Sequence, residues 1–169
     1  MLSDEFLIKG IKMTSLVPLQ DIEARLDSID LSRLALYVSK LKTIDEATNK
    51  SLAPAMMRDF IVAQDITSVL LARAVQAEMM AKNYVETAEA IAFLDRSDDY
   101  FKARNQKPTA DLRKAYVTLD PDVVVAKDTL ARATAVAVLL KNRVYEFKSA
   151  YEAVKQIYKD TQQTPWEGM

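Results

Sequence analysis

The sequence contains no cysteine and no histidine. The absence of cysteine excludes disulfide bonds and thiolate metal sites. The absence of histidine removes the commonest general base of enzymes and the residue on which most zinc and di-iron sites depend. Carboxylates alone suit Mg²⁺, but no group of Asp and Glu residues has a convincing spacing for it. We therefore predict a protein that is not an enzyme and that carries no metal and no cofactor.

Glycine is almost as scarce, because only Gly10 and Gly168 are present. A β-sheet protein of 169 residues needs many turns that contain glycine, so the composition predicts an all-α protein. A glycine-rich phosphate loop is excluded between those two positions. Half of the residues are hydrophobic and 28% are charged, which is typical of a globular chain with a hydrophobic core.

Long uninterrupted apolar runs are missing as well. The longest run, residues 134–140, is far too short to cross a bilayer. The first residues include Asp4 and Glu5, and no apolar stretch of the signal-peptide type follows them. These features predict a soluble, cytoplasmic protein that does not contact a membrane.

The net charge of −1 conceals an uneven distribution of charge. Residues 1–99 hold 11 basic and 16 acidic side chains, whereas residues 100–160 hold 12 basic and 7 acidic ones. The second part can therefore present a positive field to an anionic partner although the whole chain is slightly acidic. The alternative is that the excess reflects ordinary solvated helix faces.

Two long stretches of helical periodicity dominate the chain. The first begins near Pro54, which suits a first helical turn, and is expected to end at residues 104–106, before Pro108. The second begins at Asp120-Pro121-Asp122, which has the pattern of an N-cap and two first-turn residues, and runs to about Thr161. Apolar or small residues recur in steps of three and four, as in a coiled-coil seam. We expect the two helices to pair antiparallel along seams that include Leu70, Ala77, Leu130, Ala137, Val144 and Phe147.

The sequence divides into an N-terminal helical segment (1–52), a helical hairpin (53–161) and an irregular tail (162–169). Residues 1–17, with Phe6, Leu7, Ile8 and Ile11, form either a short helix or an ordered arm. Pro18 is predicted to open a helix, and Asp30 and Ser32 are candidate N-caps of the next helix, which we expect to break near Asn49. Trp166 in the tail is too isolated a feature to indicate a role.

The connection between the long helices, residues 100–120, combines basic and aromatic residues. Thr109 is expected to cap a short helix, Ala110–Thr118. On this helix we expect Leu112, Ala115 and Tyr116 to face inward and Arg113 and Lys114 to face outward. Basic residues with aromatics among them suit the backbone and the bases of a nucleic acid. The candidate contacts are Lys102, Arg104, Lys107, Arg113, Lys114, Tyr100 and Phe101. Just before them, Asp95, Asp98 and Asp99 either hold a cation or pair with nearby basic side chains.

The same region resembles a known family. Phe101-Lys102-Ala103-Arg104 is similar to the Leu-Lys-Ala-Arg motif of the UvsY-type recombination mediators of T-even-like phages and their small helical relatives. A basic helix led by Thr109, the turn Asp120-Pro121-Asp122-Val123 and a long helix follow in the same order. The resemblance covers roughly the C-terminal half of the chain.

The resemblance implies a ring-like homo-oligomer that binds single-stranded DNA. Such a protein displaces or remodels single-strand-binding protein and loads a RecA-like recombinase, and it would act in the cytoplasm of the host cell. Lys102 and Arg104 carry over as DNA contacts. Apolar residues off the seam, such as Val125, Val138 and Leu139, also need cover, which the N-terminal helices and other subunits can supply.

A second class of function fits the same helices. A non-enzymatic structural or adaptor protein, or a phage protein that inhibits a host enzyme, would act through protein–protein contacts alone. Its basic face would then be solvated or would meet an acidic partner. Binding of single-stranded DNA discriminates between the two classes.

Overall fold

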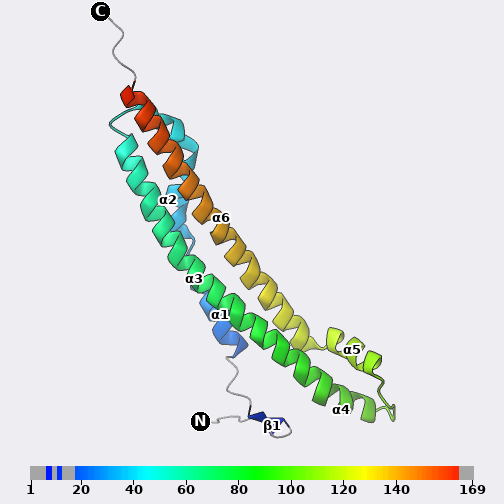
Figure 1. Cartoon of the computed structure of the whole chain (residues 1–169). Helices are drawn as coiled ribbons and strands as arrows, with labels where there is room; N and C mark the ends of the chain where they lie inside the picture. Colours follow the sequence, from blue (N-terminus) through cyan, green and yellow to red (C-terminus); the bar gives the residue numbers. More distant parts are fainter. Residues whose placement is uncertain (1–6, 9–10, 13–17, 164–169) are drawn as a thin grey trace, which may run out of the picture. The chain divides into compact units, whose positions relative to one another are not determined.

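The computed structural model describes residues 7–8, 11–12 and 18–163 (Figure 1). The chain is all-α, as predicted, apart from one short pair of strands. These strands, β1 (Leu7–Ile8) and β2 (Ile11–Lys12), pair antiparallel, so Leu7, Ile8 and Ile11 do not form the short helix that is one of the two alternatives for residues 1–17. Phe6 and Trp166 lie outside the described residues.

The residues group into two compact units. One contains Met1–Leu26 and Gln76–Ala133, and the other contains Asp27–Val75 and Thr134–Met169. Both long helices pass from one unit into the other. Each unit therefore combines ranges that are separate in the sequence, whereas the three segments expected from the sequence are each one continuous range.

The N-terminal helices are short. Helix α1 (Leu19–Asp27) follows Pro18 as predicted, and it buries Ile22 and Leu26. Helix α2 (Ser32–Lys40) begins where the Asp30 carboxylate accepts a hydrogen bond from the Ser32 amide at 2.9 Å. Hydrogen bonding from the Ser32 side chain, and then from its amide, holds the pKa of Asp30 below its usual value, because both stabilise the charged carboxylate.

Helix α2 continues into a 3-10 helix, η1 (Leu41–Thr48), which ends at the predicted break. The backbone at Asn49 is extended there. The Asn49 side chain then accepts from the amide and the hydroxyl of Ser51. The turn into the next helix is therefore stabilised by a local side-chain contact.

Helices α3 (Ala53–Ile91) and α6 (Pro121–Gln163) are the two long helices. The start of α6 has the predicted cap, because the Asp120 carboxylate accepts from the amides of Asp122 and Val123 at 3.1 and 3.3 Å. These bonds satisfy amides that have no partner within the helix.

The two long helices run antiparallel in the first unit. Glu89 pairs with Lys127, and Arg96 pairs with Asp122. Arg96 follows Glu89 in the sequence, whereas Asp122 precedes Lys127, so the two segments run in opposite directions. Their shared core is Val85, Ala88, Ala92, Val123 and Ala126. In the second unit, the rings of Phe60 and Phe147 stack with centroids 6.4 Å apart.

Most of the predicted seam residues are buried, but in places the buried position lies one residue away from the predicted one. Leu70, Ala77, Ala137 and Phe147 are buried, whereas Leu130 and Val144 are half-buried. Near the end of α3 and the start of α6 the buried positions move by one residue. Val85, Ala92 and Thr129 are buried there, and Tyr84, Ile91 and Leu130 are half-buried.

A π-helical turn interrupts the first long helix. The turn, η2 (Ala92–Arg96), leads into α4 (Ser97–Lys102), so the regular α-helix expected as far as residues 104–106 is not continuous. Ala92, Ser97 and Phe101 are the successive buried residues of this segment. The spacing of five residues between Ala92 and Ser97 reflects the wider π turn, which contains one more residue than an α-helical turn. The Ser97 amide bonds the carbonyl of Ala92, and its hydroxyl donates to the carbonyl of Phe93 at 2.7 Å.

Several apolar side chains lie off the seams. In the second unit, Leu34 and Val38 of α2 line a hollow of about 180 Å³ together with Leu139 and Leu140 of α6. Helix α2 thus provides part of the expected cover for Leu139. Val138 and Val125, which belong to different units, remain exposed.

One stretch, Ala53–Lys102, is long and apolar enough to cross a membrane by length and composition. Its most apolar window has a mean hydropathy of 1.3, although no uninterrupted apolar run reaches the length of a bilayer. The core helix of a soluble protein meets the same criteria. In this stretch the seam residues, such as Phe60 and Ala74, are fully buried within the chain.

Candidate nucleic-acid interface

The basic connection lies within the first unit and begins where α4 ends. The Asn105 amide donates to the carbonyl of Lys102, and the Gln106 amide donates to the carbonyl of Phe101. Asn105 has a φ of 52°, in the left-handed region that glycine usually occupies at a helix end. Asparagine tolerates this conformation, so the helix ends here without a glycine.

Helix α5 (Ala110–Leu119) carries the second half of the connection. Its predicted cap is present, because the Thr109 hydroxyl accepts from the Leu112 amide at 3.3 Å. The predicted orientation is wrong for Leu112 and Ala115, which are exposed, and for Arg113, which is half-buried, but it is confirmed for the half-buried Tyr116 and the exposed Lys114. None of the residues of α5 is fully buried, so side-chain contacts on one face determine its position.

Arg113 makes the first of these contacts. Its guanidinium pairs with the Asp98 carboxylate at 2.5 Å and donates to the carbonyl of Phe93 at 3.5 Å. The same group lies 5.8 Å from the centre of the Phe93 ring. Arg113 therefore faces the π turn and α4, which explains why Leu112 on a neighbouring face is left outside.

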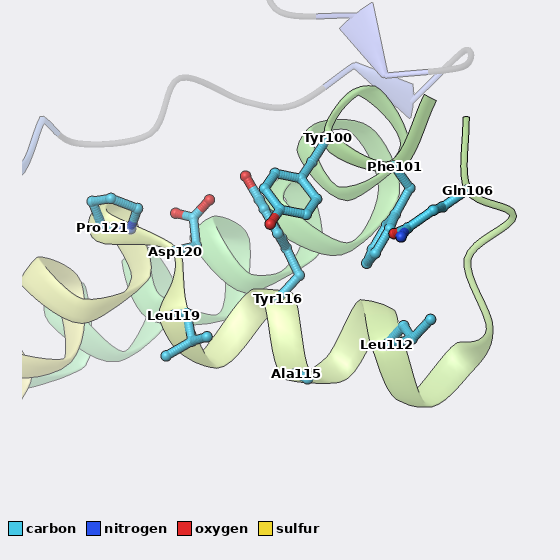
Figure 2. Close-up of a pocket in the computed structure, with 9 residues that line it drawn as sticks. All are labelled: Tyr100, Phe101, Gln106, Leu112, Ala115, Tyr116, Leu119, Asp120 and Pro121. Atoms are coloured by element: carbon cyan, nitrogen blue, oxygen red, sulfur yellow. The ribbon is translucent and has the colours of Figure 1, made fainter. Parts of the chain in front are cut away.

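Three aromatic rings make the second contact between α4 and α5 (Figure 2). The centroid of the Tyr116 ring lies 5.0 Å from that of Tyr100 and 6.5 Å from that of Phe101. Phe101 is 5% exposed, so its ring packs in the interior, whereas Tyr100 is 39% exposed. Burial, and then the nearby Asp120 carboxylate, raise the pKa of Tyr116, so the phenol keeps its proton at neutral pH.

Arg104 lies over the Tyr100 ring. The centre of its guanidinium is 3.7 Å from the centroid of the Tyr100 ring, and it donates to the carbonyl of the same residue at 3.3 Å. Such cation–π contacts orient the guanidinium while leaving it charged. Arg104 remains exposed, so this contact presents a positive charge to solvent.

The other basic residues of the connection divide into two kinds. Lys102, Lys107 and Lys114 are exposed, and no ion pair is found for them within the described part of the chain. Arg113 is engaged with Asp98. The structure therefore places four exposed cations on the connection and gives the fifth, Arg113, a structural contact.

A partly buried ion pair anchors the end of the connection. Arg96, in the π turn, pairs with Asp120 at 2.9 Å and also with Asp122. The Asp120 side chain is 1% exposed and carries the cap of α6 as well. The cap could be read from the sequence, but its partner Arg96 could not, because no local pattern joins the two residues.

The acidic residues before the connection do not gather into a metal site. Asp98 pairs with Arg113, as one of the two predicted alternatives proposes. Among the described residues, no three acidic side chains converge as ligands of a cation would.

A cavity of about 490 Å³ opens between α4 and α5 (Figure 2). Tyr100 and Tyr116 lie at its aromatic side, and Gln106 comes from the loop between the helices. Leu112 and Leu119 add apolar surface, and Leu119 is 79% exposed. The connection thus combines exposed cations with an aromatic and apolar hollow.

Comparison with known proteins adds no further assignment. No protein-family model, no curated protein and no solved structure matches this chain.

Proposed function

We propose that this protein is a recombination mediator that binds single-stranded DNA along its basic connection. The observation that carries the proposal is the exposure of Lys102, Arg104, Lys107 and Lys114 beside the partly exposed ring of Tyr100. Cations neutralise phosphates, and an aromatic group offers a stacking surface that any base can use. The resemblance of residues 101–104 and 120–123 to the UvsY-type motifs supports the same function.

The proposed mechanism depends on repetition. One connection offers only a few phosphate contacts, so a homo-oligomer would multiply them into avidity. Exposed apolar side chains on both long helices, such as Met79 and Val138, support self-association. In this role the protein would displace single-strand-binding protein and load a RecA-like recombinase without making or breaking a bond. A light-scattering mass well above that of two 19.0 kDa chains is expected, and a monomeric mass would contradict the avidity mechanism.

The test is a titration of a labelled oligothymidylate at several salt concentrations. The logarithm of the affinity should fall with the logarithm of the salt concentration, by about 0.7 for each phosphate contacted. Lys102→Ala combined with Arg104→Ala should weaken binding and flatten this slope. Lys148→Ala combined with Lys159→Ala removes the same charge from exposed positions on α6 and should leave the slope unchanged.

Helicity and oligomer mass are measured for both double variants. A wild-type protein that does not bind the strand even at low salt would contradict the proposal. An unchanged salt slope in the Lys102 and Arg104 variant would contradict the assignment of these residues. In either case the adaptor function, in which the exposed apolar side chains contact another protein, becomes the better hypothesis.

A further inference from the structure

The cavity between α4 and α5 has the composition of a site for a planar, largely apolar ligand. Its volume of about 490 Å³ lies within the range of small-molecule sites, about 300–1,000 Å³. The lining includes the aromatic side chains Tyr100, Phe101 and Tyr116 and the apolar side chains Leu112 and Leu119. A flat ring can be buried against such a surface while its edge stays near polar groups.

Polar groups lie at the ends of this surface. Gln106 lines the cavity from the loop, and its amide can both donate and accept a hydrogen bond. Asp120 lines the opposite end, but its charge is paired with Arg96 and it accepts from the amides of α6. Because this carboxylate is already compensated, its repulsion of a nearby phosphate is reduced.

Positive charge lies close to the cavity. Arg104 lies against the Tyr100 ring, and Lys107 follows the lining residue Gln106 in the loop. Both cations are exposed. An occupant with apolar faces and a negatively charged backbone matches both the interior and these two cations.

We propose that this cavity holds one unstacked base of a bound single strand, while neighbouring phosphates lie against Arg104 and Lys107. This inference rests on the proposed binding of single-stranded DNA and adds a specific site for a base. Contacts to phosphates alone would not distinguish a strand with bases from one without them. If the cavity holds a base, the protein should bind the strand with bases more tightly.

The test compares a labelled oligothymidylate with an abasic deoxyribose-phosphate strand of the same length. The wild-type protein should bind the strand with bases about 5- to 150-fold more tightly, which corresponds to the usual effect of stacking a base on an aromatic side chain. Tyr100→Leu should remove most of this preference, since the stacking ring is lost. Tyr145→Leu makes the same change at a position on α6 that is 58% exposed, and should keep the preference.

A second pair of variants fills the cavity without removing a ring. Ala115→Leu places a bulky, non-aromatic side chain at the lining and should reduce the preference for bases. Ala110→Leu is the control, because Ala110 is an exposed residue of the same helix that is not part of the lining. Circular dichroism checks that each variant is folded. If Tyr100→Leu does not fold, the comparison of Ala115→Leu with Ala110→Leu tests the base site.

The outcomes separate this inference from the proposed function. Equal affinity of the wild-type protein for the two strands would overturn the base site and leave the proposed DNA binding intact. A preference for bases that survives both Tyr100→Leu and Ala115→Leu would also overturn it, because the base would then bind elsewhere. If neither strand binds at low salt, the proposed function and the base site fail together.

Discussion

The core around Phe60 and Phe147 and the connection carrying α5 are stabilised by different kinds of contact. The two rings of the core are completely buried and stack on each other. Helix α5 has no fully buried residue and is positioned by one ion pair, a group of three rings and a cap. Burial of apolar surface provides most of the stability of a folded chain, whereas specific polar contacts determine which groups a surface presents.

Apolar burial stabilises the core around Phe60 and Phe147, whereas only a few contacts hold the connection. A segment with few buried apolar contacts opens at a lower free energy than the core. We therefore expect the amides of α5 to exchange with solvent faster than those of α3 around Phe60. The four predictions that follow test this difference.

The largest effect is expected in the core. Phe147→Ala removes a buried ring and its contact with Phe60, and should lower the free energy of unfolding by about 3–5 kcal/mol. Urea denaturation followed by circular dichroism measures this loss. Tyr145→Ala, two positions away and exposed, is the control and should change stability by less than about 0.5 kcal/mol. Equal losses for the two variants would show that the Phe147 ring is not in the core.

A smaller loss is expected at the anchor of the connection. Asp120→Ala removes the cap of α6 and leaves Arg96 without one of its carboxylate partners, so stability should fall by about 2–3 kcal/mol. Asp120→Asn keeps a capping oxygen and loses only the charge, so its loss should be clearly smaller. Thermal and urea denaturation of both variants provide the comparison. Identical losses would mean that the cap contributes nothing.

The seam should show a loss of similar or smaller size. Ala137 is 6% exposed, so Ala137→Leu should overpack the seam and cost about 1–3 kcal/mol. Ala135 is exposed on the same helix, and Ala135→Leu should leave the melting temperature nearly unchanged. If Ala137→Leu melts at the wild-type temperature, close packing at this position is refuted.

The smallest effects should divide the basic residues of the connection. Arg113→Ala breaks a partly exposed ion pair, and should cost about 0.5–1 kcal/mol of stability while leaving the salt slope of DNA binding unchanged. Lys114→Ala should do the opposite, with unchanged stability and a slope reduced by about 0.7 if this lysine contacts one phosphate. Denaturation and salt titration of both variants measure the two quantities. A flattened slope for Arg113→Ala would assign Arg113 to the DNA surface.

Much of the fold could be predicted because its signals are local. Asp120 and Thr109 cap their helices as expected, and the periodicity identified most of the buried seam. The connection was predicted less well. The five basic residues are predicted to form one surface, but Arg113 faces Asp98, and Leu112, expected inside, is exposed. The ion pair of Arg113 and the ring contacts of Tyr116 with α4 determine which face of α5 is covered, and no pattern within α5 encodes these contacts.

The sequence by itself determined the all-α class, the two long helices and the caps at which α5 and α6 begin. These features follow from backbone preferences and side-chain spacing within a few turns of helix. Only the tertiary structure decided the π turn at residues 92–96, the pairing of Arg96 with Asp120 and the cavity beside Tyr100. Each of these depends on how side chains distant in the sequence pack against one another, and no local pattern of residues encodes that packing.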